Sequence, residues 1–293
     1  MSLSEASLKD RIRNLAQSEG RSINEILKQL YLERFLARLA RSEYADKFIF
    51  KGGNLLAFFI ELGRETRDLD FLITKLAAEE VALEAAFKTI AACETEDGFA
   101  LKFVGIERLA QAHMNYPGFR ATIEIRFVKG TLHDNLQIDL GIGDVVTPEN
   151  QALELLRHRG KAFFEATLSL LVYPPETIFA EKLESVLSKG GINSRMKDYH
   201  DLILMSRKAG FLDNDRLKYD IRATFAHRGM ELRLPLDFQD RDFEELQGHW
   251  TRHLRGLGKL AETLKIPAHI KQVVTETNDF LRSAGLLGTE GGN

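Results

Sequence analysis

The chain has 293 residues, of which 44% are apolar and 28% charged, and its formal net charge is −3. This length allows two domains, and the near-neutral charge excludes a general electrostatic attraction to nucleic acid, so an RNA site must be a local patch. The single cysteine, Cys93, excludes an intramolecular disulfide and a zinc site built from cysteines. We see neither the apolar core of a signal peptide nor a membrane-spanning run, and we expect a protein of the reducing cytoplasm.

Two amphipathic helices are expected first. Apolar residues recur at helical spacing over residues 4–17, and a capping box from Ser22 to Glu25 opens a second periodic run that continues to Leu39. The outer faces of these helices carry four basic side chains, Lys28, Arg34, Arg38 and Arg41. We interpret this face as solvated; the alternative is the wall of an RNA groove.

The most informative stretch begins with a buried strand, a glycine pair and a short helix. Phe48–Phe50 is an aromatic and β-branched run of the kind found in buried strands. Gly52 and Gly53 can adopt positive φ and expose backbone N–H groups, so a ligand phosphate could approach them closely. Asn54 can cap the helix that follows, and a helix N-terminus favours anions.

The same stretch returns as a strand with two aspartates on one face. Side chains alternate along a strand, so Leu69, Phe71 and Ile73 share one face while Asp68 and Asp70 share the other. Neighbouring carboxylates repel and are best tolerated with a cation between them, and oxygen ligands suit Mg²⁺. The alternative is an ordinary Gly-Gly turn beside an edge strand whose aspartates are merely solvated.

Further strands follow a helix expected over residues 77–92. We expect strands at residues 101–104, 121–128 and 136–141, because the last two alternate cleanly between apolar and polar positions. In the third of these strands, Asp139 lies on the face opposite the apolar residues. Asp144 is the competing carboxylate if the strand assignment is shifted.

The composition changes after Pro148, and we expect the rest of the chain to be helical. Lys182 lies on the apolar stripe of a helix that ends at Gly190, so it passes the core edge or points into a pocket. On the next helix Arg195, Asp198 and Asp201 form one ridge, and Lys197 can pair with Asp201. Taken alone, this pattern indicates a helix with exposed ion pairs, each contributing less than ~1 kcal/mol.

The last third carries scattered basic residues and a histidine pair. His249 and His253 have i, i+4 spacing, but no third ligand is arranged as in a zinc site. We interpret them as surface residues, with contact to RNA phosphates as the alternative, and Trp250 as a core residue.

Four motifs in order carry a family resemblance. They are Phe-Lys-Gly-Gly at 50–53, Arg-Asp-Leu-Asp-Phe at 67–71, Glu-Lys-Leu-Glu at 181–184 and Ser-Arg-x-Lys-Asp-x-x-Asp-Leu at 194–202. Together they resemble the AbiEii abortive-infection toxins within the DNA polymerase β-like nucleotidyltransferases, over roughly residues 48–205. The chain departs from that pattern at Gly53, where many relatives have Ser or Thr, and at Asn54, where others have Thr, so a hydroxyl contact to phosphate is missing.

The resemblance implies an α/β (α+β) fold. We expect a small mixed sheet with two leading helices over residues 1–150, a helical C-terminal lobe over 151–288 with a cleft between the lobes, and a frayed tail over 289–293.

The resemblance also implies a set of site residues. Asp68, Asp70 and Asp139 would bind Mg²⁺, with Mn²⁺ as an alternative. The catalytic residues would be Asp68, Asp70, Lys182 and Asp198. The nucleotide, an NTP substrate, would be bound by Gly52, Gly53, Asn54, Lys182, Arg195 and Lys197.

The implied function is that of a toxin in a bacterial toxin–antitoxin or phage-defence system. Several members of the family add nucleotides to the 3′ end of tRNA, so we expect nucleotidyl transfer to RNA, a cognate antitoxin and a monomer without membrane association. Two alternatives remain: transfer of NMP or phosphate to a protein such as the antitoxin, and a non-catalytic module that binds nucleotide or RNA. The preferred base and the acceptor cannot be deduced from the sequence.

Overall fold

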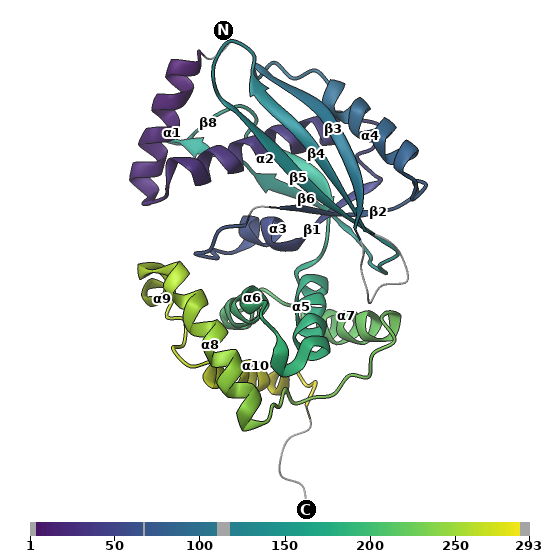
Figure 1. Ribbon diagram of the computed structural model, residues 1–293, viewed down its shortest axis with the longest axis vertical. Helices are drawn as coiled ribbons and strands as arrows, with labels where there is room; N and C mark the ends of the chain where they lie inside the picture. Colours follow the sequence, from purple (N-terminus) through teal and green to yellow (C-terminus); the bar gives the residue numbers. More distant parts are fainter. Residues whose placement is uncertain (1–3, 67, 110–117, 288–293) are drawn as a thin grey trace, which may run out of the picture. The chain divides into compact units, whose positions relative to one another are not determined.

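The computed structural model describes residues 4–66, 68–109 and 118–287 (Figure 1). The expected tail over 289–293 and Arg67 of the second motif lie outside these residues. The chain divides into two compact units, which we describe separately. The sheet unit contains residues up to 58, 65–144 and 148–173, and the helical unit contains residues 59–64, 145–147 and those from 174 onward.

The described residues form a mixed set of helices and strands. The helices are α1 (Glu5–Glu19), α2 (Ile23–Arg41), α3 (Gly52–Phe59), α4 (Glu80–Ala92), α5 (Pro175–Lys189), α6 (Met196–Arg207), α7 (Asn214–His227), α8 (Asp240–Leu257), α9 (Lys259–Thr263) and α10 (Ile270–Ser283), with a 3₁₀ turn η1 (Gly190–Ile192). The strands are β1 (Phe48–Lys51), β2 (Leu69–Ile73), β3 (Phe99–Leu109), β4 (Gly118–Phe127), β5 (His133–Ile142), β6 (Glu149–Glu154), β7 (Arg157–His158), β8 (Lys161–Ala162) and β9 (Thr167–Val172).

The described part of the chain builds a seven-stranded sheet in the order β3-β4-β5-β2-β1-β9-β6. Strand β2 pairs parallel to β5 and antiparallel to β1, and β1 pairs parallel to β9, so the sheet is mixed as predicted. The long strands β3, β4 and β5 form antiparallel neighbours at one side of the sheet (Figure 1). The central pair, β1 and β2, comes from the stretch that the sequence singled out.

An aromatic core holds one face of this central pair. Phe50 and Phe71 face each other across β1 and β2 with ring centroids 5.2 Å apart. Phe35 of α2 packs on Phe71, and Phe87 of α4 packs on Phe48. Since side chains alternate along strands, the polar residues of β1 and β2 are directed to the opposite face.

The N-terminal helices begin where the sequence predicts. Ser4 caps α1, and Ser22 with Glu25 forms the predicted capping box of α2. The prediction of a solvated basic face is wrong for Arg34 and Arg38, whose side chains are 0% and 2% exposed. Both guanidinium groups are buried because carboxylates distant in sequence neutralise them.

The prediction of helical structure directly after Pro148 is wrong. Residues 149–172 contain β6 and β9, which pair antiparallel and extend the sheet beyond β1, and the short hairpin β7–β8 lies between them. The division between the units accordingly follows Tyr173. Alternating positions such as Leu168, Leu170 and Val172 are buried, so the strand period was present in the sequence.

The helical unit consists mainly of α5 to α10. Pro175 occupies the first turn of α5, as expected for a residue without an N–H group. Trp250 of α8 is fully buried and its indole N–H donates to the carbonyl of Pro267, which confirms it as a core residue. Among the helices described, none is both long and apolar enough to cross a membrane.

Candidate functional site

A row of four charged side chains crosses the sheet at its centre. The strand registers place Arg120 opposite Asp139, Asp139 beside Asp70, and Asp70 opposite Lys51. Directly paired residues of neighbouring strands point to the same face, so all four side chains share the face opposite the aromatic core. Two carboxylates are thus flanked by two cations, one from β4 and one from β1.

Gly52 makes room for one of these carboxylates. Its φ is +78°, and a Cβ atom at this position would overlap the carboxylate of Asp70. A side chain here would therefore displace Asp70 and also strain the backbone. The sequence suggested a bare backbone for a phosphate; the structure adds that the missing side chain gives space to Asp70. Gly53 is the second residue of α3.

Asn54 does not cap α3, because the helix already begins at Gly52. Its side-chain amide instead donates a 2.6 Å hydrogen bond to the backbone carbonyl of Asp68. The short helix therefore fixes the main chain where β2 begins. This contact links the glycine motif at the start of α3 to the aspartate motif at the start of β2.

Asp139 is held by Arg120 through two hydrogen bonds of 2.6 and 2.8 Å. The pair is half-exposed, with 29% of the Arg120 side chain and 26% of the Asp139 side chain accessible. The hydrogen bond to Asp139 raises the pKa of Arg120, and the charge of Asp68 raises it further. Arg120 therefore acts as the counter-ion of Asp139 and Asp68, and no local sequence pattern indicated this role.

Asp144 has a different partner. Its carboxylate accepts a 2.8 Å hydrogen bond from Lys51 Nζ, and the hydroxyl of Tyr173 lies 3.3 Å away. Asp139, and not Asp144, is the carboxylate in register with Asp70. Lys51 was not singled out in the sequence, although its position directly before Gly52 was the available signal.

The donor set fits Mg²⁺ with two carboxylates better than with three. Asp70 lies in β2 and Asp68 directly precedes that strand, close enough to Arg120 for its charge to raise the pKa of that side chain. Mg²⁺ commonly takes one or two carboxylates together with substrate phosphates. Among the described residues, no three acidic, histidine or cysteine side chains gather closely enough to hold a metal by themselves. Asp139 would join such a set only in competition with Arg120.

A second charged cluster lies inside the helical unit. Lys182 Nζ of α5 lies 2.6 Å from Asp201 and 3.4 Å from Asp198, both on α6. Arg64 binds Asp201 through two hydrogen bonds of 2.7 and 2.5 Å. The four side chains are between 0% and 10% exposed. The structure thus brings together Lys182 and Asp198, two of the site residues named from the sequence, and adds Asp201 and Arg64.

Opposite charges keep this buried cluster ionised. Burial by itself would raise the pKa of Asp201, but Lys182 and Arg64 outweigh it and lower that pKa. Burial would likewise lower the pKa of Lys182, whereas Asp201 and Asp198 raise it. Two cations and two carboxylates balance, which is how buried charges are tolerated. The predicted Lys197–Asp201 pair is replaced by this cluster.

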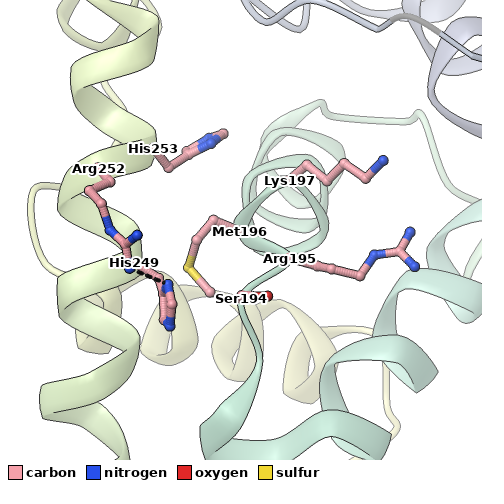
Figure 2. A pocket seen from close by; sticks show the side chains of 7 residues that line it. All are labelled: Ser194, Arg195, Met196, Lys197, His249, Arg252 and His253. Atoms are coloured by element: carbon pink, nitrogen blue, oxygen red, sulfur yellow. Dashed lines mark hydrogen bonds between the residues drawn. The ribbon is translucent and has the colours of Figure 1, made fainter.

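Arg195 and Lys197 lie where α6 begins. Arg195 Nε lies 3.3 Å from Asp198, and 51% of the Arg195 side chain is exposed. Lys197 is exposed, and both residues line a cavity of about 550 Å³ together with residues of α8 (Figure 2). The interpretation of His253 as a surface residue is wrong, since His253 is half-buried and contacts His200.

The comparisons with known proteins give the family of the chain. Residues 34–275 match the family model described as nucleotidyl transferase AbiEii toxin, type IV TA system. No curated protein matches the sequence.

Two solved structures are similar to this chain. JHP933 from Helicobacter pylori superposes with a TM-score of 0.50 at 14% identity, covering 90% of this chain and 92% of that chain. An inferred nucleotidyltransferase from H. pylori gives a TM-score of 0.45 at 12% identity, covering 90% of this chain and 95% of that chain. At such identities the JHP933 match shows the fold alone.

Proposed function

Because this chain belongs to the AbiEii family of nucleotidyltransferase toxins of type IV toxin–antitoxin systems, we propose that it transfers NMP from an NTP to RNA, at the 3′ end of tRNA. The observation that best supports this activity is the placement of Asp70 beside Asp139, with Asp68 directly before the same strand. Carboxylates in this pattern suit a reaction that needs charge neutralisation more than covalent help.

In the proposed reaction an RNA hydroxyl oxygen attacks the α-phosphorus of the NTP. The bond to the oxygen that bridges to the β-phosphate breaks, and pyrophosphate leaves with that electron pair. Asp198 is our candidate for accepting the hydroxyl proton, since its carboxylate is buried but adjoins the exposed Arg195. Lys182, 3.4 Å from Asp198, would neutralise negative charge.

The sheet unit would supply the metal and phosphate contacts. We propose Asp68 and Asp70 as ligands of Mg²⁺ or Mn²⁺ and Asp139 as a third ligand in competition with Arg120. The metal would neutralise charge that develops on the phosphates. Gly52 and Gly53 would lie against the triphosphate. Arg195 and Lys197, which the resemblance assigns to the nucleotide, would add positive charge for the phosphates of the RNA acceptor. Asn54 would act indirectly, by holding the backbone at Asp68.

The biological setting follows from the family. A toxin of a type IV system implies an antitoxin, and we propose that growth arrest by this enzyme serves phage defence. Blocking the acceptor end of tRNA would stop aminoacylation. An acceptor hydroxyl on RNA therefore connects the chemistry of the site to the toxicity.

The test compares wild type with the double variant Asp68→Asn/Asp70→Asn. Each protein is incubated with total tRNA, Mg²⁺ and each α-labelled NTP in turn, and the products are resolved on a denaturing gel. We expect labelled tRNA with wild type and a loss of at least about 100-fold in the variant, since removing preorganised charge from a transfer site costs on this order. The preferred NTP is read from the same gel.

The matched control is Asp46→Asn, which removes an exposed aspartate of the same unit whose ion pair among the described residues is with exposed Lys75. It should label tRNA as wild type does. Undiminished labelling by the double variant would refute the assignment of the carboxylates. Label on a protein instead of RNA would show that the acceptor is a protein and would refute the RNA acceptor.

A further inference from the structure

The cavity of the helical unit is lined by the start of α6 and by one face of α8. Its lining residues are Ser194, Arg195, Met196, Lys197, His249, Arg252 and His253 (Figure 2). The volume of about 550 Å³ falls within the range of small-ligand sites and leaves space for more than one phosphate group. The α8 residues belong to none of the four motifs that relate the chain to its family.

Positive charge dominates this cavity. Of the described residues that line it, none is acidic, whereas three carry a permanent positive charge. Arg252 donates to His249 Nδ1 at 2.7 Å and to the carbonyl of Gly248, so within the described structure its charge is not matched by a carboxylate. Lys197 likewise forms no ion pair with a described residue. Only Arg195 shares its charge, with Asp198.

The two histidines contribute polar groups rather than charge. His249 Nδ1 accepts from Arg252, so its proton lies on Nε2 and its ring is neutral. His200 Nε2 must donate to the carbonyl of Leu62, which leaves His200 Nδ1 to accept from His253 Nε2. Burial, followed by the neighbouring His200 and Arg64, lowers the pKa of His253 to about 4. His253 is therefore a neutral donor fixed in orientation.

These features suit the phosphates of a polynucleotide better than an NTP. An NTP arrives with its metal and requires carboxylates to hold it, and none of the described lining residues is a carboxylate. A phosphodiester carries a single charge and needs only cations and hydrogen-bond donors. The one neighbouring indole, Trp250, is fully buried, so it offers no stacking surface to a base.

We propose that this cavity, through Arg252 with Lys197 and Arg195, binds backbone phosphates of the RNA acceptor. This inference rests on the proposed function, because it assigns a contact to the acceptor named there. Contacts of this kind position a strand without reading its sequence. The α8 face would then hold RNA irrespective of base, while other parts of the protein select the reacting end.

The test measures RNA affinity directly. Wild type and Arg252→Gln are titrated into a fluorescein-labelled single-stranded RNA of mixed sequence at several salt concentrations, followed by anisotropy. We expect Arg252→Gln to bind several-fold more weakly at low salt. The slope of log affinity against log salt should fall by about 0.7 for the one lost contact with single-stranded RNA. Arg252→Lys, which keeps the charge, should retain most of the salt slope.

The matched control is Arg222→Gln on α7, an exposed arginine of the same unit that does not line the cavity. It should leave affinity and salt slope unchanged. Equal behaviour of Arg252→Gln and Arg222→Gln would refute the proposal. So would a loss of NTP binding in Arg252→Gln without RNA, since that result would make the cavity a nucleotide site.

The two proposals fail separately. If wild type labels tRNA but Arg252→Gln binds RNA normally, the cavity assignment falls and the enzymatic proposal stands. If Arg252→Gln weakens RNA binding while wild type transfers no nucleotide to RNA, the cavity assignment stands and the acceptor proposal falls. Unchanged Trp250 fluorescence would verify that the variant is folded, because Trp250 is the only tryptophan and is buried in the same unit.

Discussion

The two units carry similar sets of charges in different surroundings. The row on the sheet contains two aspartates and two cations. At one end of this row, the side chains of Arg120 and Asp139 are 29% and 26% exposed. The cluster in the helical unit also contains two aspartates and two cations, but Asp201 is 0% exposed and Arg64 only 7%. Water and ligands can compete for the first set, whereas the second set is enclosed except where Asp198 meets the exposed Arg195.

The comparison teaches how loss of activity should be interpreted in each unit. A substitution on the half-exposed row changes charge at a surface, so its effect on activity reports on the site. A substitution in the buried cluster leaves an unmatched charge in the interior and destabilises the fold. Inactive Lys182 or Asp201 variants therefore need a stability measurement before a catalytic role is assigned.

The largest stability effect is expected for Asp201→Asn. This change leaves Arg64 and Lys182 facing Asp198 as the remaining carboxylate of the cluster, so we expect a loss of about 3–5 kcal/mol in the free energy of unfolding. Urea unfolding followed by Trp250 fluorescence reports on this unit. Asp215→Asn, which removes a 95% exposed aspartate, should cost below about 1 kcal/mol. Similar losses in both variants would contradict the distinction between buried and exposed charge.

The buried carboxyl of Glu33, in the sheet unit, should make the protein less stable as pH rises. Burial raises the pKa of Glu33 from 4.5 to about 7, although the N–H of Leu156 donates to it. The folded state therefore prefers protonated Glu33, and this stabilisation is complete below about pH 4.5 and is lost as pH rises through 7. The full difference is about 3 kcal/mol at most.

Calorimetry of wild type and Glu33→Gln at pH 5 and pH 8 tests this expectation. The wild type should lose melting temperature relative to the variant as pH rises. Glu84→Gln, at a half-exposed glutamate of α4 paired with Lys88, is the control and should follow wild type at both pH values. A pH-independent difference between wild type and Glu33→Gln would show that Glu33 does not titrate in this range.

The buried histidines of the helical unit should have a smaller effect of the opposite sign, making the protein less stable as pH falls. Burial lowers the pKa of His253 from 6.5 to about 4, and burial also lowers that of His200. The unfolded chain therefore takes up protons first, and stability is lost as pH falls from 6.5 towards 4. Partial exposure of His253 makes this effect smaller than that of Glu33.

The urea midpoint of wild type and His253→Gln between pH 7 and pH 4.5 measures this effect. The decline on acidification should be shallower in His253→Gln than in wild type. His227→Gln, at an exposed histidine at the end of α7, should show the wild-type decline. If the urea midpoints of wild type and His253→Gln decline in parallel on acidification, His253 is not the titrating group.

The sequence alone determined the local elements and the family. Helix caps such as Ser22 with Glu25, the alternation that separates Asp68 and Asp70 from Phe71, and the four motifs all depend on residues close together in the chain. Local sterics and hydrogen bonding decide such features, so the pattern is sufficient to predict them. The strand period of residues 167–172 is local as well, so the helical prediction after Pro148 is wrong despite a pattern that the sequence contains.

The tertiary structure decided which charges are buried and with what they pair. Arg38 binds Asp97, 59 residues away, and Arg64 binds Asp201, 137 residues away. Strand register brought Arg120 to Asp139, and the fold set His253 beside His200. A helical pattern gives the face on which an arginine lies but not what covers that face. Exposure and partner identity arise from packing between distant segments, which no local period encodes.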